Sequence, residues 1–132
     1  MNYRYLAIDF GESYVGFAVS NGILARPLEV FKYPQGNYKI LQKHLFKIIE
    51  KNIPSVIIVG IPLSSLNSSL KIKEIFNDFL FDKSGWKEKL IWFDEDYSTK
   101  EAILLKKKKR MREDSIAASI VLEKYLESIR FN

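Results

Sequence analysis

The chain has 132 residues, a formal net charge of +5 and a sequence pI near 9.3, with 47% hydrophobic and 28% charged residues. This is the size and composition of one globular domain, and the lack of cysteine excludes thiol nucleophiles, thiolate zinc sites and disulfides. The single histidine, His44, excludes paired-histidine metal sites, no apolar run approaches the roughly 18 residues of a membrane span, and the basic balance indicates an anionic partner such as nucleic acid.

The first third of the chain is predicted to form an antiparallel meander of three strands. Apolar residues dominate Tyr3–Phe10 and Val15–Ser20, and a short turn separates the two runs. Asn21-Gly22 is a pair that favours a two-residue type I′ hairpin, so we expect a third strand over Ile23–Val30. Pro27 has no amide donor and therefore confines this strand to a sheet edge or a bulge.

After residue 36 helical and strand patterns alternate, which is typical of an α/β fold. Apolar residues recur at helical spacing before Pro54, and again after a polar loop predicted over Ser64–Ser69. The apolar runs Ser55–Gly60 and Leu90–Phe93 suit buried parallel strands. Two more helices are predicted, one opened by a capping box at Ser98 and Glu101 and one starting near Asp114. The apolar faces of the first two helices comprise Leu41, Leu45, Ile48 and Ile49, then Ile72, Ile75, Phe76, Phe79 and Leu80.

Carboxylates stand at the ends of two predicted parallel strands. Right-handed crossovers make the first strand and the two later apolar strands neighbours, so Asp9, Gly60 and Asp94-Glu95 would share the edge where open α/β sheets hold ligands. Carboxylates without histidine favour Mg²⁺ or Mn²⁺, and two such ions would assist hydrolysis of a phosphodiester. Two of the acids also have a structural alternative. Asp9 could cap a turn, and Asp114 could be a charge in the first turn of a helix, where the helix dipole favours it.

Ordered motifs across nearly the whole chain resemble the YqgF family of Holliday-junction-resolvase-like nucleases. They are Ile8-Asp9-Phe10-Gly11 with Val15–Ser20, Ala25-Arg26-Pro27-Leu28, Ile58–Leu63, Asp94-Glu95 with Ser98-Thr99, and Glu113-Asp114-Ser115 with Ala117-Ala118 and Tyr125-Leu126. The resemblance implies an α/β, RNase H-like fold, a five-stranded mixed sheet (antiparallel meander plus parallel strands) flanked by helices. It matches Asp9, Glu95 and Asp114 to the family's catalytic acidic triad and leaves Asp94 as a further candidate metal ligand.

The chain departs from the family's pattern at three places. Glu12-Ser13-Tyr14 stands where the family usually carries a basic residue, Asp96 stands where an arginine normally follows the Asp-Glu motif, and Ser64–Asn67 replaces a loop that normally includes Asp-Gly. Two of these changes remove positive charge from the predicted cleft. Either the phosphate contacts have moved elsewhere or catalysis is weakened.

The densest basic segment lies between the Glu95 and Asp114 motifs. It is a candidate for nucleic-acid binding, because a basic arm tracks phosphates without reading bases, and a solvated helix end is the structural alternative. We also expect Gly11 and Gly60 to bring backbone close to the cleft. The basic residues are Lys106, Lys107, Lys108, Lys109, Arg110 and Arg112.

These observations predict that residues 1–132 form a single RNase H-like nuclease domain with a two-ion Mg²⁺ or Mn²⁺ site. The resemblance implies RNA as the substrate, 5′-end processing of pre-16S rRNA, and ribosomal precursor particles as partners. A resolvase acting on branched DNA and a non-catalytic RNA- or ribosome-binding factor are the alternatives. We expect a cytoplasmic monomer or homodimer without a signal peptide or membrane association.

Overall fold

The computed structural model describes residues 3–62, 65–80, 85–94 and 114–130. Five strands form one mixed sheet in the order β3-β2-β1-β4-β5. The first three strands pair antiparallel, and β4 and β5 run parallel to β1, which confirms the predicted meander and parallel strands. The strands are β1 (Tyr5–Phe10), β2 (Tyr14–Ser20), β3 (Ala25–Lys32), β4 (Val56–Ile61) and β5 (Leu90–Asp94).

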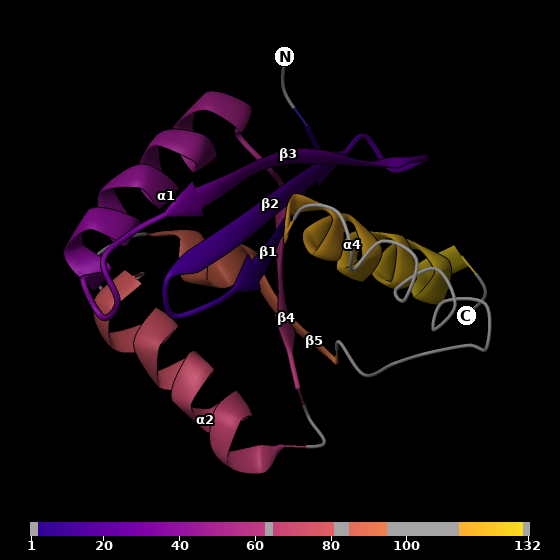
Figure 1. The fold of residues 1–132 in the computed structure, drawn as a ribbon. Helices are drawn as coiled ribbons and strands as arrows, with labels where there is room; N and C mark the ends of the chain where they lie inside the picture. The colour runs from indigo at the N-terminus through magenta and orange to yellow at the C-terminus, as the bar shows by residue number, and fades with distance from the viewer. Residues whose placement is uncertain (1–2, 63–64, 81–84, 95–113, 131–132) are drawn as a thin grey trace.

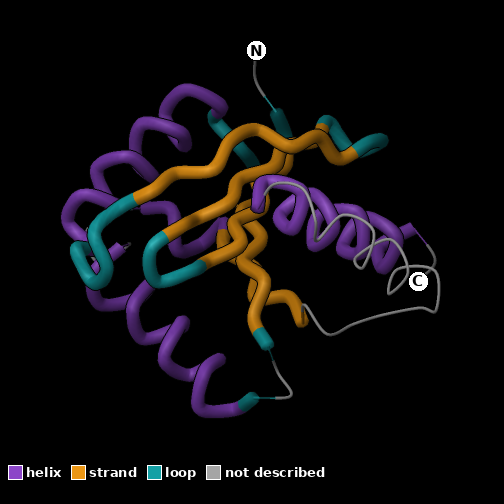
Figure 2. Tube along the Cα trace, in the orientation of Figure 1, coloured by secondary structure: helices purple, strands orange, loops and turns teal. Residues whose placement is uncertain are grey.

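Helices cover both faces of the sheet. Figure 1 shows α1 (Tyr38–Asn52) and α2 (Leu66–Ile75) on one side and α4 (Asp114–Arg130) on the other, and Figure 2 shows the strands between them. Two buried clusters result, because successive strand residues face opposite ways. The cluster under α1 includes Leu6, Ile8 and Phe17, whereas the cluster under α4 includes Ala7 and Ala18. No helix among the described residues is long and apolar enough to span a bilayer.

The hairpin between β2 and β3 differs from the predicted two-residue turn. Ser20 pairs with Ala25, so four residues form the loop, and only Gly22 among them has a positive φ, at 110°. The Ser20 hydroxyl accepts a hydrogen bond from the Gly22 amide (2.9 Å), and the Asn21 side chain accepts one from the Ile23 amide (3.3 Å). These local bonds stabilise a wider loop in place of a type I′ turn.

Strand β3 lies at the edge of the sheet, as Pro27 predicts. Pro27 pairs with Ala18 next to a register shift between Phe17 and Ala18. A proline is tolerated there because its missing amide hydrogen interrupts the ladder only at a bulge on an edge strand.

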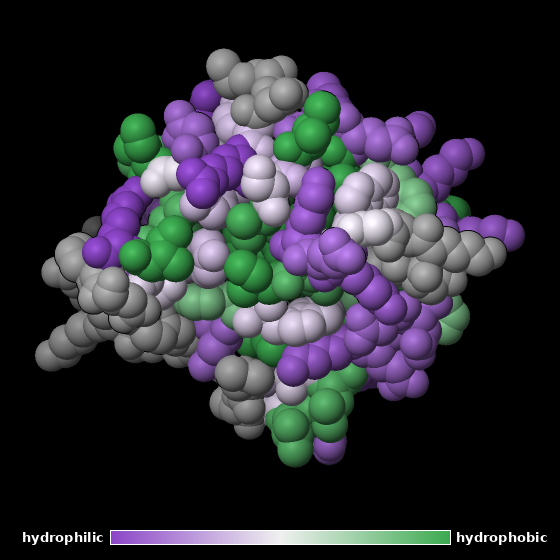
Figure 3. Space-filling view, turned by 180° about the vertical axis from the view of Figure 1, so that it is seen from behind, coloured by the Kyte–Doolittle hydropathy of each residue, from purple (hydrophilic) through white to green (hydrophobic). Residues whose placement is uncertain are grey.

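Helix α2 begins earlier than the sequence pattern indicates. The predicted polar loop Ser64–Ser69 contains the first turn, since the helix starts at Leu66 and the Ser69 amide donates to the Ser65 carbonyl (3.0 Å). The Ser69 hydroxyl is buried and donates to the Leu66 carbonyl, so serine satisfies the backbone within the helix. Leu66 and Leu70 stay exposed, and hydrophobic side chains gather at this end of the molecule in Figure 3.

Two short turns follow α2 that the sequence pattern does not distinguish from ordinary helix and loop. Phe76–Leu80 forms a π-helical turn that continues α2, and Gly85–Lys89 forms a 3₁₀ turn before β5. Phe76 and Leu80 are buried, so the predicted apolar face is confirmed there, whereas Phe79 is 53% exposed.

His44 lies on α1 in a structural setting. Its ring stacks on Phe31 with the centroids 3.8 Å apart, and its Nε2 is 2.7 Å from the Glu29 carboxylate. The residue therefore joins α1 to β3, on the face of the sheet opposite α4.

Candidate functional site

Asp9 lies near the end of the central strand, between two glycines. The antiparallel register pairs it with Gly16 of β2, and the parallel register pairs it with Gly60 of β4. Neither neighbour has a side chain, so no Cβ atom crowds the carboxylate from either side. Gly60 therefore adds no side chain beside Asp9. The sequence pattern does not single out Gly16, although the hairpin pairing of β1 with β2 is the signal that could have found it.

Asp9 faces the side of the sheet that α4 covers. Tyr5 and Ala7, at alternate positions of the same strand, belong to the buried cluster under α4, and alternation assigns Asp9 to that face. The carboxylate is half-buried at the strand end. The four residues of β1 before Asp9 are apolar and buried, so Asp9 lies where the strand reaches the edge of the core.

Asp94, the last residue of β5, lies at the same edge but on the opposite face. Gly60 pairs with Phe93, and the Phe93 ring packs edge-on against Tyr125 of α4, with centroids 5.7 Å apart. Trp92 packs instead on Phe76 in the other cluster, at 5.7 Å. Strand alternation assigns Asp94 to the face of Trp92. The structure therefore does not bring Asp94 to the face of Asp9.

The C-terminal part of helix α4 packs near the β2–β3 loop and the start of β1. Its last residue, Arg130, donates through Nη2 to the carbonyls of Gly22 (2.9 Å) and Ile23 (2.6 Å) in the β2–β3 loop. Near the same end, the Tyr125 ring lies 6.1 Å from that of Tyr5, the first residue of β1.

Asp114 is the first residue of α4, and its side chain lies outside the described part of the structure. The residue stands one helical turn before Ala118, which is fully buried in the same cluster as Ala7. Of the predicted triad, Asp9 is the residue whose side chain the structure describes.

The turn after Asp9 requires glycine at position 11. A Cβ atom added to Gly11 would lie 2.5 Å from the backbone oxygen of Tyr14, which is closer than real contacts allow. The Gly11 carbonyl accepts a 2.6 Å hydrogen bond from the Tyr33 hydroxyl, and the Tyr33 amide donates to the Ser13 carbonyl (3.0 Å). Burial raises the pKa of the Tyr33 hydroxyl well above its usual range, so this donor keeps its proton.

Glu12 in the same turn is held by two neighbouring elements. Lys71 of α2 lies 3.1 Å from its carboxylate, and the Gln35 side chain donates to it at 2.9 Å. The hydrogen bond and charge of Lys71 lower the pKa of the Glu12 carboxyl, and Glu12 in turn raises the pKa of Lys71. The sequence gives no signal for these contacts, because Glu12 and Lys71 are 59 residues apart.

Several predicted residues lie outside the described part of the chain. They are Glu95, the capping box at Ser98 and Glu101, and the basic residues Lys106, Lys107, Lys108, Lys109, Arg110 and Arg112; the Asp114 side chain is likewise not described. Among the described residues, no group of three or more histidine, aspartate or glutamate side chains is placed to hold a metal ion.

Comparison with solved structures identifies the fold. RuvC of Thermus thermophilus, solved with a Holliday junction substrate, superimposes with a TM-score of 0.65 at 16% identity, over 97% of this chain and 95% of that one. A second Thermus thermophilus RuvC structure gives a TM-score of 0.56 at 14% identity, over 94% and 95% of the two chains. This likeness confirms the predicted RNase H-like fold.

The chain belongs to the RuvX family, whose model is described as Holliday junction resolvase and matches residues 3–128. Curated relatives agree with this assignment and with the resemblance found in the sequence. A protein of Mycoplasma capricolum subsp. capricolum is 30% identical, with 97% of this chain and 98% of that relative covered. One from Aster yellows witches'-broom phytoplasma is 34% identical, with 99% and 93% covered. Both carry the name "Putative pre-16S rRNA nuclease".

Proposed function

We propose that this protein is a metal-dependent nuclease that hydrolyses RNA phosphodiester bonds in 5′-end processing of pre-16S rRNA. The observation that carries the proposal is Asp9, which lies between two glycines near the end of the central strand. The names of the curated relatives support the RNA substrate. The domain, residues 1–132, is proposed to act in the cytoplasm on ribosomal precursor particles.

Asp9, Glu95 and Asp114 are the residues proposed to hold Mg²⁺ or Mn²⁺. Their carboxylate oxygens are the ligands that these hard cations prefer, and the strand neighbours of Asp9 are glycines, which add no side chain beside it. Asp94 is a weaker candidate, because the β5 register assigns it to the other face of the sheet. Two bound ions would supply an activated water and would stabilise the leaving oxygen.

Among the described residues, Tyr33 holds the turn after Asp9 in position, and two other residues neutralise or bind the Glu12 carboxylate in that turn. Tyr33 fixes the Gly11 carbonyl and so holds the turn that follows Asp9. Lys71 and Gln35 engage the Glu12 carboxylate, which reduces its repulsion of an approaching phosphate. The basic residues from Lys106 to Arg112 are proposed to contact phosphates on either side of the cleaved bond.

Cleavage of a pre-16S rRNA 5′ fragment in the presence of Mn²⁺ or Mg²⁺ tests the proposal. Asp9→Asn keeps the side-chain size but removes the charge, so we expect cleavage to be lost. Asp78→Asn is the matched control, because Asp78 is an exposed aspartate in the π-helical turn on the opposite face. Equal cleavage by wild type and Asp9→Asn would contradict the assignment of the site.

Branched DNA is the second candidate substrate. The family description and the fold likeness to RuvC, solved with a Holliday junction, favour it. Symmetric cuts in a four-way junction, with pre-16S ends left intact, would establish a resolvase, and such cuts require two copies of the chain. Intact RNA affinity without metal binding in calorimetry would instead establish a non-catalytic RNA- or ribosome-binding factor.

A further inference from the structure

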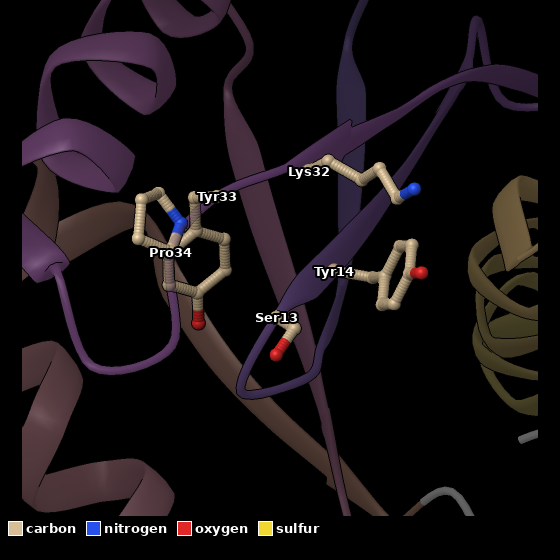
Figure 4. Close-up of a pocket in the computed structure, with 5 residues that line it drawn as sticks. All are labelled: Ser13, Tyr14, Lys32, Tyr33 and Pro34. Carbon is tan, nitrogen blue, oxygen red and sulfur yellow. The ribbon is translucent and has the colours of Figure 1, made fainter.

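An open depression of about 320 Å³ lies beside the turn that follows Asp9. Its lining residues come from the start of β2 and the end of β3, namely Ser13, Tyr14, Lys32, Tyr33 and Pro34. Figure 4 shows Tyr14 and Lys32 directed to one side and Tyr33 and Pro34 to the other. This volume is at the low end for small-molecule sites, which suits a single nucleotide rather than a larger ligand.

The strand register places this depression next to Asp9. Tyr14 pairs with Lys32, and Gly16, two residues further along β2, pairs with Asp9. Residues two apart on a strand share a face, so Tyr14 and Lys32 are on the face of Asp9. Strand spacing and rise put the Cα atoms of Tyr14 and Asp9 roughly 8 Å apart. A nucleic-acid strand lying over Asp9 would therefore pass the pair.

Tyr14 and Lys32 are available to a ligand. The Tyr14 residue is 42% exposed, and the Lys32 ammonium lies over its ring, 5.3 Å from the centroid. In the part of the chain that the structure describes, Lys32 forms no ion pair with a carboxylate. A partly exposed aromatic ring, next to a cation that no described carboxylate neutralises, offers one surface for a base and one charge for a phosphate.

The turn beside the pair is held by its own contacts. Tyr33, 5% exposed, is bonded to Gly11 and Ser13, so the wall of the depression is tied to the turn after Asp9. The nearby Glu12 carboxylate is engaged by Lys71. A site that is already ordered loses less entropy on binding.

We propose that Tyr14 and Lys32 form a binding platform for one unpaired nucleotide next to the cleaved bond, with the base on the Tyr14 ring and a phosphate on the Lys32 ammonium. This inference rests on the proposed nuclease function and names its substrate class as a strand with a single-stranded flank. A paired base is already stacked in its duplex, so only an unpaired nucleotide can use the ring.

Fluorescence anisotropy without divalent metal tests the platform, with a labelled single-stranded RNA and the blunt duplex of the same sequence. Tyr14→Ala should weaken single-strand binding about 5- to 150-fold, as expected for one stacked base, with little effect on the duplex. Tyr14→Phe keeps the ring and should bind like wild type. Lys32→Gln should weaken binding and lower the salt slope by about 1.

Two exposed residues on the opposite side of the sheet are matched controls. Phe79→Ala and Lys39→Gln remove a similar ring and a similar charge there and should leave affinity unchanged. Wild-type affinity in Tyr14→Ala, or an equal loss for single strand and duplex, would overturn the platform. The nuclease proposal would survive that outcome if Asp9→Asn still abolished cleavage. If the binding results confirm the platform but the wild-type protein cleaves no nucleic acid, only the proposal of catalysis would be rejected.

Discussion

At the scale of single residues, the surroundings of Asp9 are set by neighbours that lack side chains. Gly16 and Gly60 flank it across the sheet, and Gly11 allows the turn that follows to close on the backbone oxygen of Tyr14. Glycine is required at position 11 because there is no room for a Cβ atom, and not because the backbone has a positive φ there. A side chain at any of these positions would occupy room that the site or its turn requires.

Gly11→Ala is therefore expected to destabilise the protein and to displace the turn. The added Cβ would lie 2.5 Å from the Tyr14 oxygen, so backbone has to move, at a cost of about 1–3 kcal/mol in the free energy of unfolding. Urea denaturation measures the change. Gly85→Ala is the control, because nothing lies within 4 Å of its added Cβ, and it should stay within about 0.5 kcal/mol of wild type. Equal effects of the two substitutions would show that the turn is not sterically constrained.

Tyr33→Phe removes only the hydroxyl that holds the Gly11 carbonyl, and should cost about 1 kcal/mol at neutral pH. Because burial raises the pKa of Tyr33 in the folded state, its unfolded form ionises first, above about pH 10. The stability that Tyr33 contributes is thus complete below that pH and is lost as pH rises further. Unfolding measured from pH 8 to 11 should show a shallower alkaline decline for Tyr33→Phe. An unchanged alkaline slope in Tyr33→Phe would mean that the hydroxyl does not hold its proton through burial.

At the scale of elements, α1 ends in an unfavourable conformation. Ile53 follows the helix in the left-handed region, with φ 46° and ψ 57°, and its amide donates to the Ile49 carbonyl at 2.8 Å. This position normally takes glycine, because a Cβ atom is disfavoured there and β-branching adds to the cost. Ile53 is 58% exposed, so its side chain adds little packing in return.

Ile53→Gly should accordingly stabilise the protein by about 1 kcal/mol, an increase measured as a higher urea midpoint. Ile40→Gly provides the contrast, because Ile40 is a 42% exposed residue inside the same helix. That substitution should destabilise by about 0.5–1 kcal/mol through helix propensity. A loss of stability in Ile53→Gly would show that its side chain contributes packing that outweighs the backbone cost.

The elements also show what sequence could predict. Leu41, Leu45 and Ile48 recur on one face, and that periodicity was sufficient to predict α1 and its buried side. The contact of Tyr33 with Gly11 could not be predicted, because it joins residues 22 apart through tertiary packing. The start of α2 was missed because Ser69 resembles a loop residue and satisfies the helix backbone only in three dimensions.

The acidic site was predicted to the extent that topology determines it. Parallel pairing brings Asp9 and Asp94 to one edge, as the apolar strands indicate. The face of the sheet on which each acid lies depends on the strand register, and a one-residue shift in register moves a side chain to the other face. The sequence pattern therefore could not show that Asp94 and Asp9 lie on opposite faces. Register also revealed the neighbouring pair of Tyr14 and Lys32, which no local motif signals.

At the scale of the whole molecule, the distribution of positive charge matters more than its total. Lys43, Lys47 and Lys51 are exposed on α1, which covers the face of the sheet opposite Asp9. The basic residues from Lys106 to Arg112 precede α4 in the sequence, between the proposed metal ligands Glu95 and Asp114. Only charges near the path of the nucleic acid can replace its condensed counterions.

Salt dependence of RNA binding separates these two groups of lysines. With about six phosphate contacts, affinity should fall on the order of a thousandfold from 50 to 200 mM salt. Replacing Lys106, Lys107 and Lys108 with glutamine should remove about half of this slope, whereas the same change at Lys43, Lys47 and Lys51 should leave it unaltered. Both variants lower the net charge by three, so any difference reports location alone. Equal slopes in the two variants would show that the protein binds through its overall charge and that the segment before α4 is not a phosphate-binding arm.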